Sequence, residues 1–345
     1  MKKTFLFGER SPKPFGQDIE TTLFHNEAQC RRTPPKPPKF TLFCGMDFAF
    51  RLDIMKTTKN LTEILRNNHQ HWVGDGFPVR TLFSYNGHGN KISPFLMLDY
   101  GLGEFPPTDE RRGVGEHPHR GFETVTIVYE GSVEHRDSGG GGGAIGRGDV
   151  QWMTAASGVV HEEFHGREFA KTGGAFEMAQ LWVNLPAKDK MSSPRYQEVL
   201  DAHIARTDLP GDAGTVRVIA GEYGEHKGAA KTYSRLNVWD VRLKAGQKAE
   251  FTVTDGDTVI LPVFAGQVKV NGQQTVGTAE AGLFDQTGTT FTLENTGAEE
   301  AKILFLSGEP LNEPIAGYGP FVMNTNEEIY QAMKDYQSGK MGRLA

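Results

Sequence analysis

Short apolar runs alternate with turn residues along the chain from residue 72 onward. The runs are rich in β-branched and aromatic side chains and are bounded by Gly, Asp, Asn and Pro; they cover residues 81–85, 95–100, 124–129, 176–183, 216–220, 249–253, 259–264 and 302–306. Many short strands separated by turn signals are typical of a β-sandwich or a β-barrel. The pattern therefore predicts an all-β protein.

One segment near the C-terminus has the features of a helix instead. A polar residue among positions 324–326 can cap the start of residues 326–337, two glutamates occupy the first turn, and Gly339 follows the end. These are the usual start and stop signals of a helix. We expect a short C-terminal helix to accompany the strands.

A weak internal repeat divides the chain. The apolar run at 124–129 leads into Gly131 and the run at 259–264 leads into Gly266, an offset of 135 residues. Two similar β units at this spacing predict two stacked barrels built from one duplicated module. We place the boundary in the polar stretch after Pro194, which gives an N-terminal domain at 55–200 and a C-terminal domain at 201–345.

Residues 1–54 differ from the rest of the chain. They contain the tract TPPKPPK at 33–39, which favours extended polyproline structure with no core of its own. Either Met55 is the true start of the protein, or the segment is a loosely attached native tail. We expect residues 1–54 to form a poorly ordered N-terminal extension.

Composition and charge narrow the function classes. The 345 residues include 42 Gly, and the net charge is −6, which argues against a general nucleic-acid binder. Two cysteines cannot build a disulfide framework, which favours a reducing compartment. No apolar run approaches the roughly 20 residues of a membrane span. We expect a cytoplasmic protein without a direct nucleic-acid or membrane partner.

The candidate chemistry lies in a histidine cluster, because five of the eleven histidines fall between residues 117 and 165. Residues two apart on a strand share one face, so His117 and His119 form one pair and His161 and Glu163 form another. Two such pairs on facing strands would offer three nitrogens and one carboxylate, a set that suits Fe(II) and also Mn, Ni or Cu.

The alternative is that these histidines only satisfy buried backbone groups, since a lone H-x-H motif is common by chance. The second pair favours the metal site. His135 is expected to be structural or to support a ligand, and the role of His165 is left open.

The chain resembles the pirin family in four motifs: EHPHRGFETVT at 116–126, EHRDS at 134–138, GDVQWMT at 148–154 and GVVH at 158–161. The resemblance covers about residues 60–345 and also includes YGPFVMNT at 318–325. It implies a bicupin, in which two cupin β-barrels face each other. It further implies one mononuclear iron, Fe(II), in the N-terminal barrel, although Mn, Ni, Cu or Zn could replace it.

The same resemblance assigns the metal ligands as His117, His119, His161 and Glu163. Glu162 stands where the family usually has Ser, and strand alternation places it on the opposite face. An ordinary cupin would take Glu123 as its carboxylate ligand, so either glutamate is possible; we prefer Glu163 and expect Glu123 to orient a ligand.

The repeat offset tests the second barrel for the same ligands. It maps His117, His119 and Glu123 onto Thr252, Thr254 and Thr258. We therefore expect a C-terminal barrel without metal.

The resemblance implies quercetin 2,3-dioxygenase activity, in which a flavonol ring is opened with O₂. Glu163 or Glu123 is the candidate base for the flavonol hydroxyl. Four side chains could partly line an apolar mouth for the aromatic substrate, namely Phe122, Trp152, Met153 and Phe176. The alternative function is a metal-dependent or redox-dependent regulatory protein that acts through a protein partner.

Overall fold

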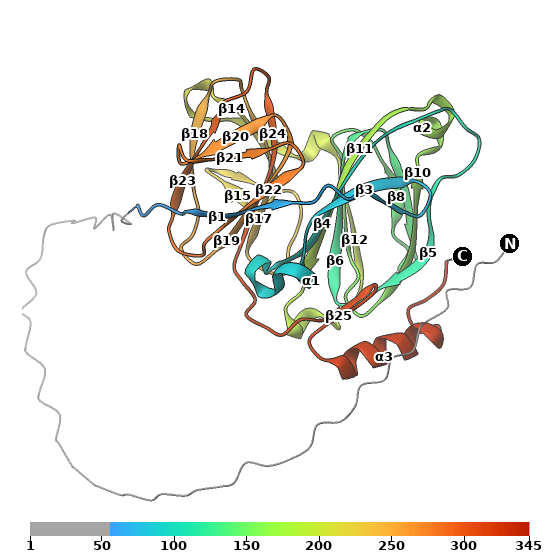
Figure 1. Ribbon diagram of the computed structural model, residues 1–345. Helices are drawn as coiled ribbons and strands as arrows, with labels where there is room; N and C mark the ends of the chain where they lie inside the picture. Colours follow the sequence, from blue (N-terminus) through green and yellow to red (C-terminus); the bar gives the residue numbers. More distant parts are fainter. Residues whose placement is uncertain (1–55, 345) are drawn as a thin grey trace, which may run out of the picture. The chain divides into compact units, whose positions relative to one another are not determined.

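The computed structural model describes residues 56–344, and the predicted extension at 1–54 lies outside the described residues (Figure 1). Antiparallel strands dominate the described residues, which confirms the all-β prediction. Each half of the chain contributes one seven-stranded sheet and one four-stranded sheet.

The first seven-stranded sheet has the order β12-β9-β6-β11-β4-β3-β2. Its strands are β2 (His71–Val73), β3 (Phe77–Ser84), β4 (Phe95–Phe105), β6 (Phe122–Glu130), β9 (Val150–Thr154), β11 (Gly174–Asn184) and β12 (Arg195–Val199). The four-stranded sheet of the same half has the order β5-β10-β7-β8. It contains β5 (Gly113–His119), β7 (Val133–Asp137), β8 (Gly142–Ile145) and β10 (Val159–His165).

The second half repeats this plan. Its seven-stranded sheet, in the order β1-β22-β19-β24-β17-β14-β13, contains β1 (Leu61–Arg66), β13 (Ala205–Asp208), β14 (Gly214–Ala220), β17 (Leu236–Leu243), β19 (Thr258–Ala265), β22 (Glu280–Phe284) and β24 (Ala301–Gly308). The smaller sheet contains β18 (Lys248–Thr252), β20 (Gln267–Val270), β21 (Gln274–Gly277) and β23 (Thr290–Asn295).

Short elements complete the described residues. Two small sheets pair β15 (Glu222–Tyr223) with β16 (His226–Lys227) and β25 (Ala316–Tyr318) with β26 (Phe321–Met323). The helices are α1 (Tyr85–His88), α2 (Arg167–Thr172) and α3 (Asn326–Gln337). The 3₁₀ turns are η1 (Gly89–Ile92), η2 (Ala187–Asp189), η3 (Asp201–His203) and η4 (Pro210–Asp212). Helix α3 has the predicted bounds, and a capping box of Thr325 and Glu328 starts it.

The internal repeat is visible in two equivalent strands. Strand β6 ends just before Gly131 and β19 ends just before Gly266, and both glycines have positive φ, at 82° and 73°. A left-handed backbone at this turn favours glycine, which explains why the repeat is readable in the sequence.

Alternation along the strands separates two interiors. Val125, Ile127 and Tyr129 of β6 belong to a core cluster that joins the two seven-stranded sheets, since Ile260, Leu304 and other residues of the second half belong to it too. Thr124 and Thr126 point to the opposite side of β6, toward the four-stranded sheet of the same half. The candidate site lies in that second interior.

The two ends of the described chain cross between the halves. Strand β1 pairs with β22 and so completes the second sheet. The C-terminal segment returns to the first half, where Phe321 bridges Arg120 and where Phe321, Met323 and Ile329 pack with Val160. A segment about 200 residues downstream thereby supports the strand that carries the H-x-H motif.

Candidate metal centre

Three of the predicted ligands converge on one point. His117 and His119 lie on β5 and His161 lies on β10, with His161 directly opposite His117 in the ladder. One ring nitrogen from each of the three histidines lies within 4.8 Å of the others. The two strands are hydrogen-bonded neighbours in one sheet, so the expectation that the pairs sit on facing strands is wrong. The four-ligand set stays a prediction, because this group holds the three histidines without Glu163.

Two of these histidines have one ring nitrogen engaged by the backbone. His117 Nδ1 lies 2.8 Å from the carbonyl oxygen of Gly115, and His119 Nδ1 lies 3.3 Å from that of Pro320. A carbonyl accepts only from a protonated nitrogen, so Nδ1 carries the proton in both rings. The lone pair is therefore on Nε2, as in metal-binding histidines.

The third histidine is oriented through a chain of side chains. His161 Nδ1 is 3.3 Å from His135 Nδ1, which also accepts from Gln151 Nε2 at 3.1 Å. His135 Nε2 donates to Asp137 Oδ2 at 3.1 Å. This assignment protonates Nδ1 of His161, and its fully buried Nε2 has no hydrogen-bond partner within residues 56–344. A buried nitrogen lone pair without a partner is costly unless something binds it.

Burial keeps two of these rings neutral. Desolvation and then the charge of His117 lower the pKa of both His119 and His161 well below the ordinary value of 6.5. Metal binding requires the neutral imidazole.

Glu163 lies beside the three histidines without joining their group. A shift of register separates His161 from Glu163 on β10. The Glu163 carboxylate lies within 4.8 Å of ring nitrogens of His135 and His161, which makes a second group that could hold a metal. Gln180 Nε2 donates to Glu163 Oε2 at 3.1 Å and Thr126 Oγ1 lies 3.4 Å from Oε1. His161 belongs to both groups.

The neighbouring Glu162 points away from the site, in agreement with strand alternation. Its carboxylate accepts from Arg136 Nε at 2.6 Å and lies 3.7 Å from Arg111.

Glu123 is on the other side of β6. It is opposite Val183 and Thr154 in the ladders, shares the face of Val125, and accepts from Thr154 Oγ1 at 2.7 Å. It belongs to neither histidine group. Desolvation raises the pKa of the Glu123 carboxyl to about 7. Its predicted role in orienting a metal ligand has no contact in the structure to support it.

Glu123 should make stability depend on pH. The pKa of Glu123, about 7 in the folded protein, exceeds the ordinary value of 4.5. Protonation of this carboxyl therefore adds to the free energy of unfolding in full below pH 4.5, and this contribution is lost as the pH rises through about 7. Glu123→Gln keeps an acceptor for Thr154 and does not ionise. Relative to the original protein, this variant should gain up to about 3 kcal/mol of unfolding free energy between about pH 5 and pH 8.

Urea unfolding at the two pH values measures this difference, with the exposed Glu225→Gln as the control. A stability difference that is the same at both pH values would contradict the prediction.

His135 should support metal binding without being a ligand of the three-histidine group. Removing a side chain that orients a metal-binding histidine typically costs about 10–100-fold in metal affinity. We expect a loss of this size in His135→Ala, measured by competition with a chelator. The control is His203→Ala, because His203 is exposed. Unchanged affinity in His135→Ala would show that the chain from Asp137 to His161 does not orient the ring.

The walls of the site differ from the predicted ones. Trp152 belongs to the core between the large sheets and Phe176 to another apolar cluster, so neither lines the site. Phe122 does approach His119, at 5.2 Å between ring centroids. Two further aromatic residues were missed: Trp182 lies 5.5 Å from His119, and Tyr196 stacks on His135 at 5.1 Å.

No local signal distinguished Trp182, which sits in an apolar run typical of a core strand. Strands of the first seven-stranded sheet also carry buried polar atoms that have no hydrogen-bond partner in the described part of the chain, namely Thr124 Oγ1, Gln151 Oε1, Trp182 Nε1 and Tyr196 OH. Such atoms favour an interior that takes up water or a polar ligand.

Both groups of possible metal ligands found among residues 56–344 lie in the N-terminal half. The absence of metal from the C-terminal domain stays a prediction. None of the helices in the same residues is long and apolar enough to cross a membrane.

Comparisons with known proteins agree with this architecture. A family model described as pirin matches residues 76–183, and one described as the pirin C-terminal cupin domain matches residues 238–342. A Pseudomonas aeruginosa protein, provisionally named a quercetin 2,3-dioxygenase, is 57% identical over 286 residues, which are 83% of this chain and 99% of that protein.

Pirin of Rattus norvegicus is 35% identical over 293 residues, 84% of this chain and 95% of that protein. A crystal structure of an Acinetobacter baumannii protein titled quercetin 2,3-dioxygenase is 52% identical and covers 83% of this chain and 99% of its own, with a TM-score of 0.80. Both halves are cupin-type domains, as the sequence predicted.

Proposed function

The chain belongs to the pirin family, and from that premise we propose that its N-terminal cupin domain binds one divalent metal ion and opens flavonol rings with O₂, as a quercetin 2,3-dioxygenase does. The similarity to two proteins whose names carry this activity, at 57% and 52% identity, supports the substrate class. The observation that carries the proposal is the meeting of three histidine nitrogens within 4.8 Å.

The residues present fit a metal ion. The unpartnered Nε2 of His161 is buried, and the hydrogen bonds of His117 and His119 leave their Nε2 lone pairs free. His117, His119 and His161 would hold the ion, and Glu163 would supply the carboxylate. Imidazole with carboxylate suits Fe(II), which we propose as the metal, and does not exclude Mn, Ni, Cu or Zn.

When bound, the ion would supply Lewis acidity toward the flavonol oxygen and redox chemistry with O₂. The protein's own part is to position and deprotonate the substrate. Glu163 is our candidate for the base, because Gln180 and Thr126 hold its carboxylate in a buried position beside the histidines. Phe122 and Trp182, 4.3 Å apart between ring centroids, offer an aromatic wall against which a flavonol ring can lie.

Oxygen consumption tests the proposal. The Fe(II)-loaded protein should consume O₂ slowly with quercetin, and the metal-free protein should not. A panel of flavonols extends the test beyond one substrate. A protein that holds its metal but consumes no O₂ with any of them would contradict the enzymatic function and favour regulation through a protein partner.

A further inference from the structure

A polar cavity of about 440 Å³ lies at the junction of the two halves. We call it the junction cavity. Its cationic lining residues are Arg147, Arg206, Arg217, Arg242 and Lys302, and its lining carboxylates are Glu130, Asp201 and Glu300. Tyr129 lines it too and lies on the face of β6 opposite the one that faces the histidines. The junction cavity is therefore separate from the candidate metal centre.

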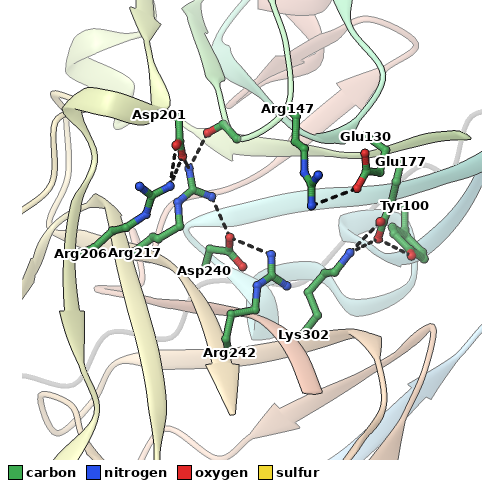
Figure 2. Close-up of polar contacts among 11 residues, drawn as sticks. Tyr100, Glu130, Arg147, Glu177, Asp201, Arg206, Arg217, Asp240, Arg242 and Lys302 are labelled. Carbon is green, nitrogen blue, oxygen red and sulfur yellow. Dashed lines mark hydrogen bonds and ion pairs between the residues drawn. The ribbon is translucent and has the colours of Figure 1, made fainter. Parts of the chain in front are cut away.

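Three guanidinium groups share two carboxylates at one side of this cavity (Figure 2). The same oxygen of fully buried Asp240, Oδ2, accepts from Arg217 at 2.8 Å and from Arg242 at 3.2 Å. Asp201 accepts from Arg217 at 2.7 Å, and both of its carboxylate oxygens lie 2.5 Å from Arg206. Within residues 56–344, these three guanidinium groups thus have one positive charge more than the two carboxylates they share.

The remaining charges pair one to one. Lys302 donates to both oxygens of Glu177, at 2.8 and 2.6 Å, and Arg147 lies 3.4 Å from Glu130. Glu300 balances the summed charge of the groups around the cavity. Because its side chain is exposed, water screens its charge. Figure 2 shows Arg147, Arg242 and Lys302 directed toward one central region.

Donors also outnumber acceptors beneath the cavity surface. Among the described residues, Tyr129 OH, Arg217 Nε and Arg242 NH1 are buried without hydrogen-bond partners, against a single unpartnered acceptor at this cavity, Asp240 Oδ1. Lys302 Nζ lies 4.7 Å and the Arg242 guanidinium 5.5 Å from the Tyr129 ring centre. Unpaired donors beside a polar cavity call for an acceptor that residues 56–344 do not supply.

We propose that the junction cavity binds a small molecule through an oxyanion, a carboxylate or a phosphate. Guanidinium groups match the geometry of both anions and form strong charge-assisted hydrogen bonds with them. The volume lies within the range of small-molecule sites. Arg242 and Lys302 form the inner side of the site, and Arg147, with 76% of its side chain exposed, forms the outer wall.

Titration calorimetry of the full, metal-loaded chain tests this at constant ionic strength, with inorganic phosphate and malonate as separate probes. We expect saturable binding of at least one probe, weakened about tenfold or more by Arg242→Gln and several-fold by Arg147→Gln. The matched control is Arg66→Gln, which removes the same charge from an exposed pair with Glu280 and should bind as the original protein does. Metal content should not change in any variant.

The two probes distinguish the sources of the anion: binding of phosphate alone identifies a phosphate site, and binding of malonate alone a carboxylate site. No saturable binding of either probe overturns the proposal. An equal loss in Arg66→Gln and Arg242→Gln also overturns it, because the effect would then be general charge. If Arg242→Gln does not fold, unchanged binding in Arg147→Gln overturns it.

Discussion

A His161→Ala variant should lose the metal almost entirely. His161 is the residue common to both possible ligand groups, it is fully buried, and no described residue is a hydrogen-bond partner of its Nε2. Removing a metal ligand lowers the metal affinity by more than the roughly 10–100-fold that is lost when a side chain that only orients a ligand is removed. Metal per chain after desalting, measured by elemental analysis, should fall from about one to near zero, and His119→Ala should behave alike.

The control is His203→Ala, because His203 is exposed. His117→Ala tests the same centre with less risk of a folding defect, because His117 is only half-buried. A folded His161→Ala protein that keeps a full complement of metal would rule out the three-histidine centre. Loss of metal in His161→Ala with full retention in His117→Ala and His119→Ala would instead indicate the second group, formed by His135, His161 and Glu163.

Glu163→Gln should reduce flavonol-dependent O₂ consumption by about 10²–10⁴-fold per bound metal, the usual contribution of a general base. The amide is close in size to the carboxylate but cannot take the proton of the flavonol hydroxyl. Expressing the rate per bound metal separates this role from any loss of metal affinity, since Glu163 is also the proposed carboxylate ligand. O₂ uptake and elemental analysis of the same samples give both quantities.

Glu123→Gln is the matched comparison, because it makes the same change on the opposite face of β6. We expect it to keep both metal and turnover. If Glu123→Gln loses turnover and Glu163→Gln keeps it, the base is Glu123 and not Glu163.

Local patterns in the sequence were sufficient for the eight strands that the apolar runs marked, for the C-terminal helix and for the repeat. The content of β-branched and aromatic residues and the flanking turn residues are local features, which is why the run at 124–129 was recognised within β6. The helix signals at Thr325 and Glu328 are equally local. The H-x-H spacing also predicted that His117 and His119 would share a face.

The partners of these residues were not readable, because they come from distant parts of the chain. His119 is held by the carbonyl of Pro320, 201 residues away, and His161 by His135, 26 residues away. The choice between Glu123 and Glu163 depends on the pairing of β6 with β9 and β11 and on the register shift in β10. Strand alternation shows which residues share a face of the strand. It does not show which other strands or side chains pack against that face.

By itself, the sequence determined the class of the fold and its division into two similar halves, because the composition of short runs and their repetition can be read directly along the chain. Only the tertiary structure decided that β1 completes the second sheet, that Glu123 faces away from the histidines and that arginines of β13, β14 and β17 meet at the junction cavity. Those arrangements follow from strand pairing and packing over long sequence separations, which leave no local periodic signal.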